Sequence, residues 1–269
     1  MHDEIREMFD LSGQVAMVTG GARDLGYDAA CILAAAGADL IITSRKLSSA
    51  EKTAASLRSQ YDCDVLPLAM DQTSFEPVST TSATAHAWKN RVDILVNNAG
   101  GGGAGNTVAT LFEREPEHID GLIQLNLNGT LYCCREIGRK MKEQQSGSII
   151  NIASIAGMLG RNRSMYERNQ MLGQPVDYAA AKGGVLGMTM DLAAVLGPDG
   201  VRVNAISPGG FSRNLPEQFV EDFSERTALG RMGRDGIDLK GAILFLASAA
   251  SEYVTGVNLP VDGGFAIWH

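Results

Sequence analysis

The feature that most constrains the fold is the alternation of short β-branched runs with longer helical stretches along the chain. Seven runs are expected to form strands, at residues 14–19, 39–43, 64–69, 93–97, 148–153, 201–206 and 256–261. Several are apolar almost throughout, as expected of strands that are covered on both faces. Strands that alternate with helices form a parallel, doubly wound sheet. The sequence therefore predicts one α/β domain over residues 1–269, with seven strands and helices on both faces of the sheet.

Composition and net charge limit the kinds of molecule that the protein is expected to bind. The net charge of −8 argues against nucleic acid or an anionic membrane as the main partner, because both need a basic face. No apolar run reaches the length of a membrane span, and the acidic N-terminal stretch is unlike a signal peptide. The four cysteines form no CxxC pair, so neither a metal site nor a disulfide scaffold is expected. A reduced, cytoplasmic compartment is the simplest interpretation.

Ligands of doubly wound sheets bind at the carboxyl ends of the strands, so the residues that follow each strand matter most. The first run is followed by TGGARDLG, residues 19–26, a glycine-rich turn whose backbone can approach a phosphate. The second is followed by Ser44 and Arg45 rather than by a carboxylate. A carboxylate would bind ribose hydroxyls, whereas Arg45 and Arg23 suit a 2′-phosphate. A simple tight turn and two solvated arginines remain the alternatives.

Polar residues also follow the later strands. Asp71 and Gln72 follow the third run, residues 97–100 (NNAG) follow the fourth, and Ser154 follows the fifth. Tyr178 and Lys182 are four positions apart, so on a helix they share one face. A free Tyr has a pKa of about 10, and a nearby ammonium favours its ionised form. Taken alone, such a pair is more commonly an ordinary helix face than a catalytic pair.

The motifs taken in order resemble the short-chain dehydrogenase/reductase family over nearly the whole chain. They are TGGARDLG, NNAG, Asn126 in LNLNG, Ser154, YAAAK at 178–182, SPGG at 207–210 and VDGGF at 261–265. The resemblance implies a single Rossmann-type domain, usually assembled as a homotetramer. It also implies an oxidoreductase that transfers a hydride between a nicotinamide cofactor and a small-molecule alcohol or ketone. Gluconate dehydrogenases and 3-oxoacyl-carrier-protein reductases share most of these motifs.

The resemblance also implies residue roles. Tyr178 is the general acid/base, Ser154 binds the same substrate oxygen, and Lys182 lowers the Tyr178 pKa and binds the nicotinamide ribose. Asn126 holds a water that links Lys182 to solvent. NADP(H) is the expected cofactor, with NAD(H) as the alternative. The residues expected to bind it are Gly20, Arg23, Asp24, Leu25, Gly26, Ser44, Arg45, Asp71, Gln72, Asn98, Ala99, Gly100, Tyr178, Lys182, Pro208, Gly209, Phe211 and Ser212.

Asp24 departs from the family pattern, which usually has a glycine at this position. It stands immediately before the first long helical stretch, where an Asp side chain can cap the helix and suits the positive end of its dipole. We therefore predict that Asp24 is a helix N-cap. The cost of a carboxylate here is repulsion of the cofactor phosphates, which Arg23 next to it can offset.

A second departure lies between two of the expected catalytic residues. Ser154 and Tyr178 are 24 positions apart, about twice the usual family separation, so residues at about 158–176 form an insertion near the active site. It carries Arg161, Arg163 and Arg168, and Arg213 lies after the SPGG motif. Arginine side chains suit carboxylate or phosphate groups. We predict that these arginines, with Ser154 and Tyr178, bind a small polar substrate such as a sugar acid, against the alternative that they pair with neighbouring acids.

Three functions compete on this sequence. The first is an NADP(H)-dependent oxidoreductase that interconverts a secondary alcohol and a ketone on a sugar-like or sugar-acid-like substrate. A 3-oxoacyl-carrier-protein reductase is the alternative within the same class. A non-catalytic dinucleotide-binding sensor is the alternative of another class, and the complete set of Asn126, Ser154, Tyr178 and Lys182 argues against it. A serine hydrolase fits poorly, because Ser154 lies outside a GxSxG motif.

Overall fold

The chain forms one seven-stranded sheet in the computed structural model, which describes residues 2–102 and 110–268. Every neighbouring pair is parallel, in the order β3-β2-β1-β4-β5-β6-β7. The strands are β1 (Val15–Val18), β2 (Asp39–Ser44), β3 (Val65–Ala69), β4 (Ile94–Asn97), β5 (Gly147–Ile152), β6 (Val201–Pro208) and β7 (Asn258–Val261). The predicted Rossmann-type, doubly wound α/β fold is confirmed.

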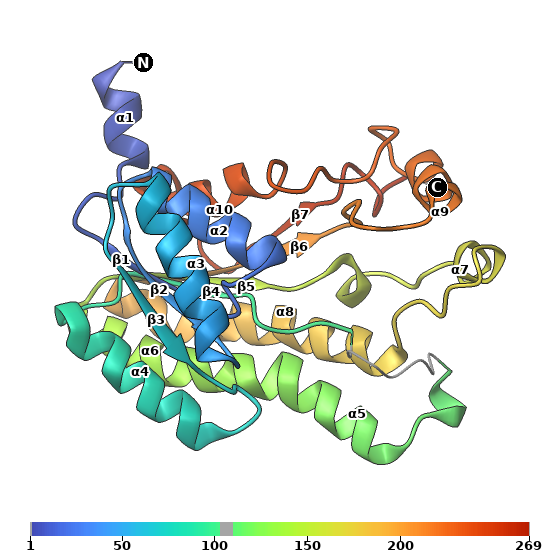
Figure 1. Cartoon of the computed structure of the whole chain (residues 1–269), viewed down its shortest axis with the longest axis horizontal. Helices are drawn as coiled ribbons and strands as arrows, with labels where there is room; N and C mark the ends of the chain where they lie inside the picture. Colours follow the sequence, from blue (N-terminus) through green and yellow to red (C-terminus); the bar gives the residue numbers. More distant parts are fainter. Residues whose placement is uncertain (1, 103–109, 269) are drawn as a thin grey trace.

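Helices cover both faces of the sheet (Figure 1). One face carries α2, α3 and α10, and the other carries α4, α6 and α8. The described helices are α1 (Asp3–Phe9), α2 (Asp24–Ala35), α3 (Leu47–Gln60), α4 (Phe75–Lys89), α5 (Pro116–Ile123), α6 (Gly129–Gln144), α7 (Ser164–Arg168), α8 (Val176–Leu196), α9 (Glu217–Glu225) and α10 (Lys240–Ala247). A π-helical turn, Gln124–Asn128, joins α5 to α6.

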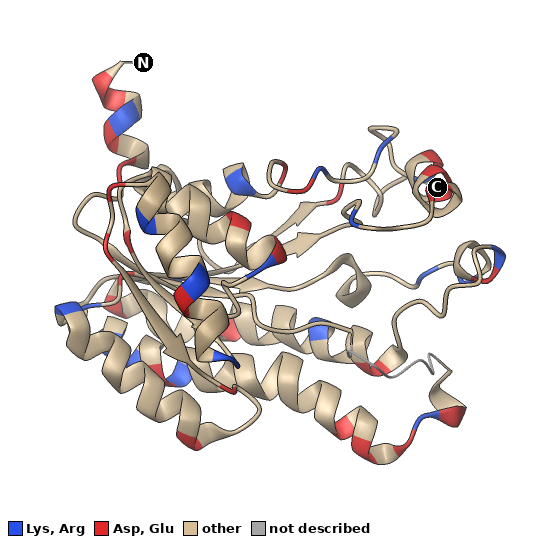
Figure 2. Cartoon of the chain, in the orientation of Figure 1, with Lys and Arg blue, Asp and Glu red and all other residues tan. Residues whose placement is uncertain are grey.

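The core is split into two apolar clusters by the sheet. Ile42 belongs to the cluster with α2 and α10, whereas its neighbour Ile41 belongs to the cluster with α4 and α6. Both side chains are fully buried, because successive residues of a strand point to opposite faces and both faces are covered. Figure 2 shows that the strands carry almost no charged residues, in contrast to the helices around them. This explains why the strands are apolar throughout rather than alternating.

Helix α8 carries part of the site on a core element. By length and composition it is the one helix, among the described residues, that could cross a membrane. In the structure it packs against β6 and α6, with Ala181 and Val185 fully buried. Burial beside the sheet explains the apolar residues on that face of α8, whereas Met190 and Val195 on the same helix are exposed.

The carboxyl ends of the strands meet at one edge of the sheet, and α7 and α9 lie beyond that edge (Figure 1). The insertion predicted before α8 contains α7 and packs against α9. The rings of Tyr166 and Phe219 make this contact, with centroids 5.3 Å apart. The two segments therefore lie beside the edge where ligands of this fold bind.

Candidate active site

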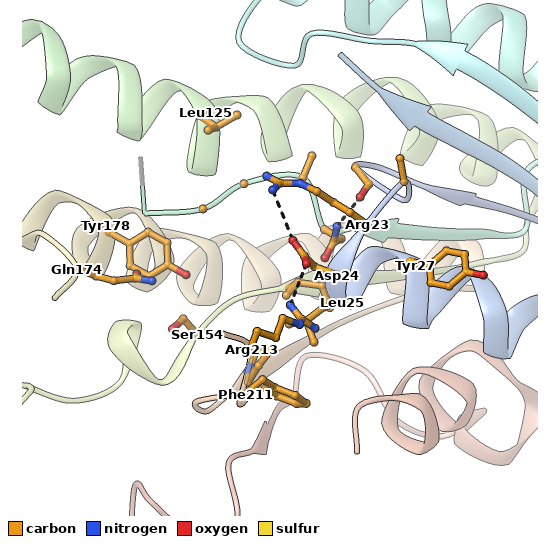
Figure 3. Close-up of a pocket in the computed structure, with 18 of the residues that line it drawn as sticks. Arg23, Asp24, Leu25, Tyr27, Leu125, Ser154, Gln174, Tyr178, Phe211 and Arg213 are labelled. Atoms are coloured by element: carbon orange, nitrogen blue, oxygen red, sulfur yellow. Dashed lines mark hydrogen bonds and ion pairs between the residues drawn. The ribbon is translucent and has the colours of Figure 1, made fainter. Parts of the chain in front are cut away.

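A cleft of about 1800 Å³ runs along the carboxyl ends of the strands. Figure 3 shows side chains from the glycine-rich loop on one side of it and Tyr178, Ser154 and Gln174 on the other. Most of the residues predicted from the sequence line this cleft. They are Gly20, Arg23, Asp24, Leu25, Ser44, Arg45, Asp71, Gln72, Asn98, Ala99, Gly100, Ser154, Tyr178, Lys182, Pro208, Gly209, Phe211 and Arg213.

The glycine-rich loop after β1 is packed too closely for side chains at two positions. Gly20 has φ +61°, and a Cβ there would lie 3.0 Å from Cα of Ala99. A Cβ on Gly26 would lie 2.4 Å from both the Asn98 side-chain nitrogen and the Gly20 carbonyl oxygen. The Asn98 amide donates to the carbonyls of Thr19 and Gly20, at 3.0 and 3.2 Å. Gly26 itself does not line the cleft, so its part is to let the loop close on Asn98.

Asp24 does not cap a helix, so that prediction was wrong. It is the first residue of α2, and the N-cap position is Arg23, which makes no side-chain capping bond. Asp24 has φ +53°, in the left-handed region where glycine is favoured, which fits the glycine expected here from the family pattern. Its carboxylate lies 3.7 Å from Arg23 Nη1 and 3.6 Å from Arg213 Nη1 (Figure 3). Asp24 is therefore an exposed carboxylate held between two cations.

The end of the cleft beside β2 and α3 is basic. Arg23, Arg45, Lys46 and Lys52 all line it, together with hydroxyl side chains of α3. Sequence reasoning missed Lys46 and Lys52, although Lys46 directly follows Arg45. Asp71 lines the same end, where hydrogen bonds from Thr73 and then the charge of Arg45 lower its pKa. Four cations in one place fit an adenosine ribose that carries a 2′-phosphate.

Two other predicted cofactor residues have a different place or role. Ser212 is exposed and does not line the cleft, and its backbone N–H donates to Gly233, so its assignment to the cofactor was wrong. Gln72 lines the cleft, but its amide donates to the carbonyls of Ala99 and Leu125, both at 2.8 Å. Gln72 thus holds the segment after β4 against the π-helical turn.

Ser154, Tyr178 and Lys182 meet where β5 ends and α8 begins. Ser154 Oγ accepts a hydrogen bond from the backbone N–H of Ala156 at 3.1 Å, and it lies close enough to Tyr178 to lower the pKa of that side chain. Tyr178 is 8% exposed, on the first turn of α8. Lys182 lies one turn further on, and its Nζ donates to the carbonyl of Ile152 at 2.7 Å. The predicted grouping of these three side chains is present in the structure.

Burial dominates the acid–base properties of this group. It raises the pKa of Tyr178, while the hydrogen bond with Ser154 and the charge of Arg161 lower it. Burial lowers the pKa of Lys182 to about 8. Arg161 is thus a cation that lowers the Tyr178 pKa, and the same effect predicted for Lys182 stays a prediction. A protonated Tyr178 at neutral pH is poised to donate to a substrate oxygen.

Asn126 lies behind the cleft and does not line it. Its side-chain oxygen accepts from the Gly101 N–H at 2.9 Å, and its nitrogen donates to the carbonyls of Gly101 and Leu122, both at 3.0 Å. The side chain is fully buried within the π-helical turn. These contacts make Asn126 a brace for the segment after β4, and the water that it was predicted to hold stays a prediction.

The arginines predicted to bind substrate are bonded elsewhere. Arg161 and Arg163 each donate to the Gln174 carbonyl at 2.8 Å, and Arg168 donates to Asp222 at 3.1 Å. None of these three lines the cleft, although the charge of Arg161 acts on Tyr178, and their contact with a substrate stays a prediction.

Arg213 does line the cleft, and its guanidinium is surrounded by carboxylates. It pairs with Asp235 and lies 3.6 Å from Asp24 and 3.8 Å from Asp28. Its charge is thus already matched by acidic partners, which corresponds to the alternative that we considered. Sequence reasoning could not see this, since the partners come from α2 and from the segment after α9.

The family assignment follows from comparison with known proteins. A family model described as enoyl-(acyl carrier protein) reductase matches residues 20–266. The chain belongs to the short-chain dehydrogenase/reductase family. It is 33% identical over 264 residues to a 3-oxoacyl-[acyl-carrier-protein] reductase of Synechocystis sp., covering 97% of this chain and all of that protein.

Two further members differ in their stated substrates. A cyclohexanol dehydrogenase of Rhodococcus sp. is 35% identical, with 94% of this chain and 96% of that protein covered. The solved structure of a gluconate 5-dehydrogenase from Burkholderia cenocepacia, in complex with NADP and tartrate, is 32% identical with a TM-score of 0.86. That match covers 97% of this chain and 98% of the other. The short-chain dehydrogenase/reductase chain described here is therefore an oxidoreductase acting on alcohols and ketones.

Proposed function

We propose that this protein is an NADP(H)-dependent oxidoreductase that interconverts a secondary alcohol and a ketone. The observation that carries the proposal is the grouping of Ser154 and Tyr178, with Lys182 one turn away, in the cleft that the glycine-rich loop also lines. A dinucleotide-binding sensor has no need of a proton-donating tyrosine paired with a serine at the ligand site.

The residues of the site divide the proton chemistry between them. When bound, NADP(H) supplies or accepts the hydride. In ketone reduction, the Tyr178 hydroxyl donates a proton to the substrate oxygen, and the Ser154 hydroxyl hydrogen-bonds the same oxygen and orients it. In alcohol oxidation the Tyr178 phenolate accepts that proton. Lys182, held by the Ile152 carbonyl, places its ammonium on the same face of α8 as Tyr178.

The basic end of the cleft supports the preference for NADP(H) over NAD(H). Arg23, Arg45, Lys46 and Lys52 line it, and the residue that ends β2 is Ser44 rather than an acid. A carboxylate at the end of β2 is what would favour an unphosphorylated ribose. The related gluconate 5-dehydrogenase was solved with NADP, which also supports this preference.

We do not extend the proposal to a sugar acid. The gluconate 5-dehydrogenase and its tartrate favour such a substrate, as the sequence motifs did. The argument from the residues of this chain rested on four arginines, and their guanidinium groups bond to carbonyls and carboxylates of the protein. The likeness to a 3-oxoacyl-carrier-protein reductase supports that activity as the second candidate. Turnover measured on a panel of substrates distinguishes this activity from the reduction of other ketones.

The homotetramer that the family resemblance implies also remains a proposal. Met190 and Val195 on α8 are 60% and 57% exposed, and Ile267 is 79% exposed. Apolar side chains so exposed are typical of surfaces that a second copy covers. Light scattering on the purified protein measures the assembly directly.

The function is tested by two variants with matched controls. Tyr178→Phe should reduce kcat with NADPH by at least about a thousandfold and leave the NADPH dissociation constant within about twofold, because it removes one oxygen from the catalytic group. Tyr253→Phe, at a fully exposed site, is the control. Arg45→Asp should erase the preference for NADPH over NADH, with Arg6→Asp on α1 as its control. Substantial turnover by Tyr178→Phe would overturn the proposed chemistry.

A further inference from the structure

The part of the cleft beyond Tyr178 has an apolar wall made by two segments that are far apart in the sequence. The insertion supplies Tyr166, Met171 and Leu172, and the α9 region supplies Leu215, Phe219 and Phe223. All of these side chains except the exposed Leu172 pack together, with Tyr166 5.3 Å from Phe219 and Phe219 6.3 Å from Phe223 between ring centroids. Ile155, which directly follows Ser154, joins the same cluster. A substrate oxygen bound at Ser154 and Tyr178 therefore has this wall beside it.

The wall carries no charge. Among the described residues of the two segments that line this part, none is an acid, an arginine or a lysine. The insertion's own cations do not line this wall: the guanidinium groups of Arg161 and Arg163 both donate to the backbone carbonyl of Gln174, although the charge of Arg161 still acts on Tyr178. A carboxylate or phosphate moved from water to this wall would lose hydration without gaining an opposite charge, which is strongly unfavourable.

Gln174 supplies a neutral hydrogen-bonding group at the edge of the wall. Its amide lies beside Tyr178 in the cleft (Figure 3). A Cβ on Gly102 would lie 3.1 Å from the Gln174 amide carbon, so the amide is enclosed from that side. Its Oε1 is buried, and no group in the described part of the chain donates to it. A buried acceptor left without a donor is costly, so the site is suited to a ligand that brings one.

The backbone around Gln174 is held in place. Two guanidinium groups fix its carbonyl, and Gly173 before it has φ +67°, with the Tyr166 ring against its Cα. The arginines that the sequence suggested as anion ligands therefore position an uncharged amide. This arrangement favours selection of a neutral donor such as a hydroxyl group.

Resting on the proposed function, we infer that the substrate is an uncharged ketone or secondary alcohol with a ring-shaped apolar body and a hydrogen-bond donor next to the reacting carbon. The ring lies against Leu215 and against the flat faces of Tyr166 and Phe219, which suit an aromatic or alicyclic ring. The donor bonds to Oε1 of Gln174. An α-hydroxy aryl ketone and the diol formed by its reduction meet these requirements.

Three ketones that share a phenyl ring test the inference with NADPH. They are 2-hydroxyacetophenone, acetophenone, and benzoylformate, which place a hydroxymethyl, a methyl or a carboxylate group next to the carbonyl. We expect kcat/KM to fall in that order, by about tenfold or more at each step. Gln174→Leu should bring the hydroxymethyl and methyl ketones within about twofold of each other, whereas Gln218→Leu on the exposed face of α9 should leave their ratio unchanged.

A second variant tests the uncharged wall. Leu215→Arg places a cation where an anion would lie, and we expect it to raise the ratio of benzoylformate to acetophenone at least tenfold. Ile5→Arg on α1, which is distant in the chain and exposed, is the control. The same comparison can be made without turnover by measuring how tightly each ketone binds to the NADPH complex of the Tyr178→Phe variant. Quenching of NADPH fluorescence reports this binding.

The outcomes separate this inference from the proposed function. If benzoylformate or a keto sugar acid is the best substrate, or if Gln174→Leu leaves the ratio of the two neutral ketones unchanged, the inference is wrong while the oxidoreductase function stands. If wild-type protein reduces neither these ketones nor keto sugars or 3-oxoacyl thioesters with NADPH or NADH, the proposed function fails. Absence of any bound aryl ketone in the fluorescence measurement also overturns the inference.

Discussion

Replacement of Asp24 by Asn should tighten NADPH binding without destabilising the protein. Asp24 occupies a left-handed backbone position at the start of α2, in the loop that would approach the cofactor pyrophosphate. Asn tolerates that conformation about as well as Asp, so the backbone should not change. The substitution removes one negative charge and leaves Arg23 without its carboxylate neighbour, whereas Arg213 keeps its ion pair with Asp235.

The size of the effect follows from the exposure of the side chain. The Asp24 side chain is 49% exposed, so each of its ion pairs contributes at most about 0.5 kcal/mol to folding. Two unit charges about 4 Å apart in water interact by about 1 kcal/mol. Loss of one such repulsion should therefore lower the NADPH dissociation constant by about fivefold. The free energy of unfolding should fall by less than about 1 kcal/mol.

The assay is fluorescence titration of NADPH at low and at high salt. The gain in affinity should shrink at about 0.5 M salt, because the Debye length is then only a few ångströms. Asp62→Asn, at an exposed turn away from the cleft, is the matched control. Weaker NADPH binding by Asp24→Asn at both salt concentrations would refute the reasoning, since it would show that the carboxylate orients the arginines for the cofactor.

Three further predictions follow from close packing, a buried ion pair and the protonation of the active site. Gly26→Ala should lower the free energy of unfolding by about 2 kcal/mol in urea denaturation and weaken NADPH binding, because its Cβ would lie 2.4 Å from the Asn98 amide. Arg114→Met should lower the free energy of unfolding by about 3 kcal/mol, because it removes the guanidinium that lies 2.7 Å from the buried Asp177 carboxylate. The double variant Arg114→Met, Asp177→Leu should recover most of this loss, because it removes the buried charge as well. The kcat/KM for alcohol oxidation should rise with pH towards the raised pKa of Tyr178, while ketone reduction should be fastest at lower pH, where Tyr178 is protonated. Flat pH profiles in both directions would contradict this last assignment.

The strands and the catalytic side chains were predictable because their signals are local. The run at 39–43 corresponds to β2, Asp39–Ser44, since a strand buried on both faces is an unbroken apolar run. Tyr178 and Lys182 share a face of α8 because helical geometry places residues four apart side by side. The prediction was less accurate for the end of β6. The predicted run stops at residue 206, whereas the strand continues to Pro208 because it pairs with β7 there.

The predicted roles that failed depended on contacts outside their own segment. Asp24 has the residue type of a helix cap, but the turn from β1 into α2, closed by Gly26 against Asn98, puts it in the left-handed region instead. Ser212 lies within two residues of lining residues, yet its backbone pairs with Gly233 and its side chain is exposed. Neither outcome can be derived from a short window of sequence.

The amino-acid sequence by itself determined the doubly wound sheet and the order in which Ser154, Tyr178 and Lys182 reach its edge. Apolar periodicity, glycine positions and helical spacing act over a few residues, so they are readable without the fold. The tertiary structure decided what each charge meets: Arg168 finds Asp222 of α9, and Arg213 finds Asp24, Asp28 and Asp235. Ion pairs and cleft walls join segments that only folding brings together, and a charged side chain takes whichever partner folding places beside it. The sequence therefore shows that the arginines are present, and the fold shows that they are already bonded to groups of the protein beside the apolar wall of the cleft.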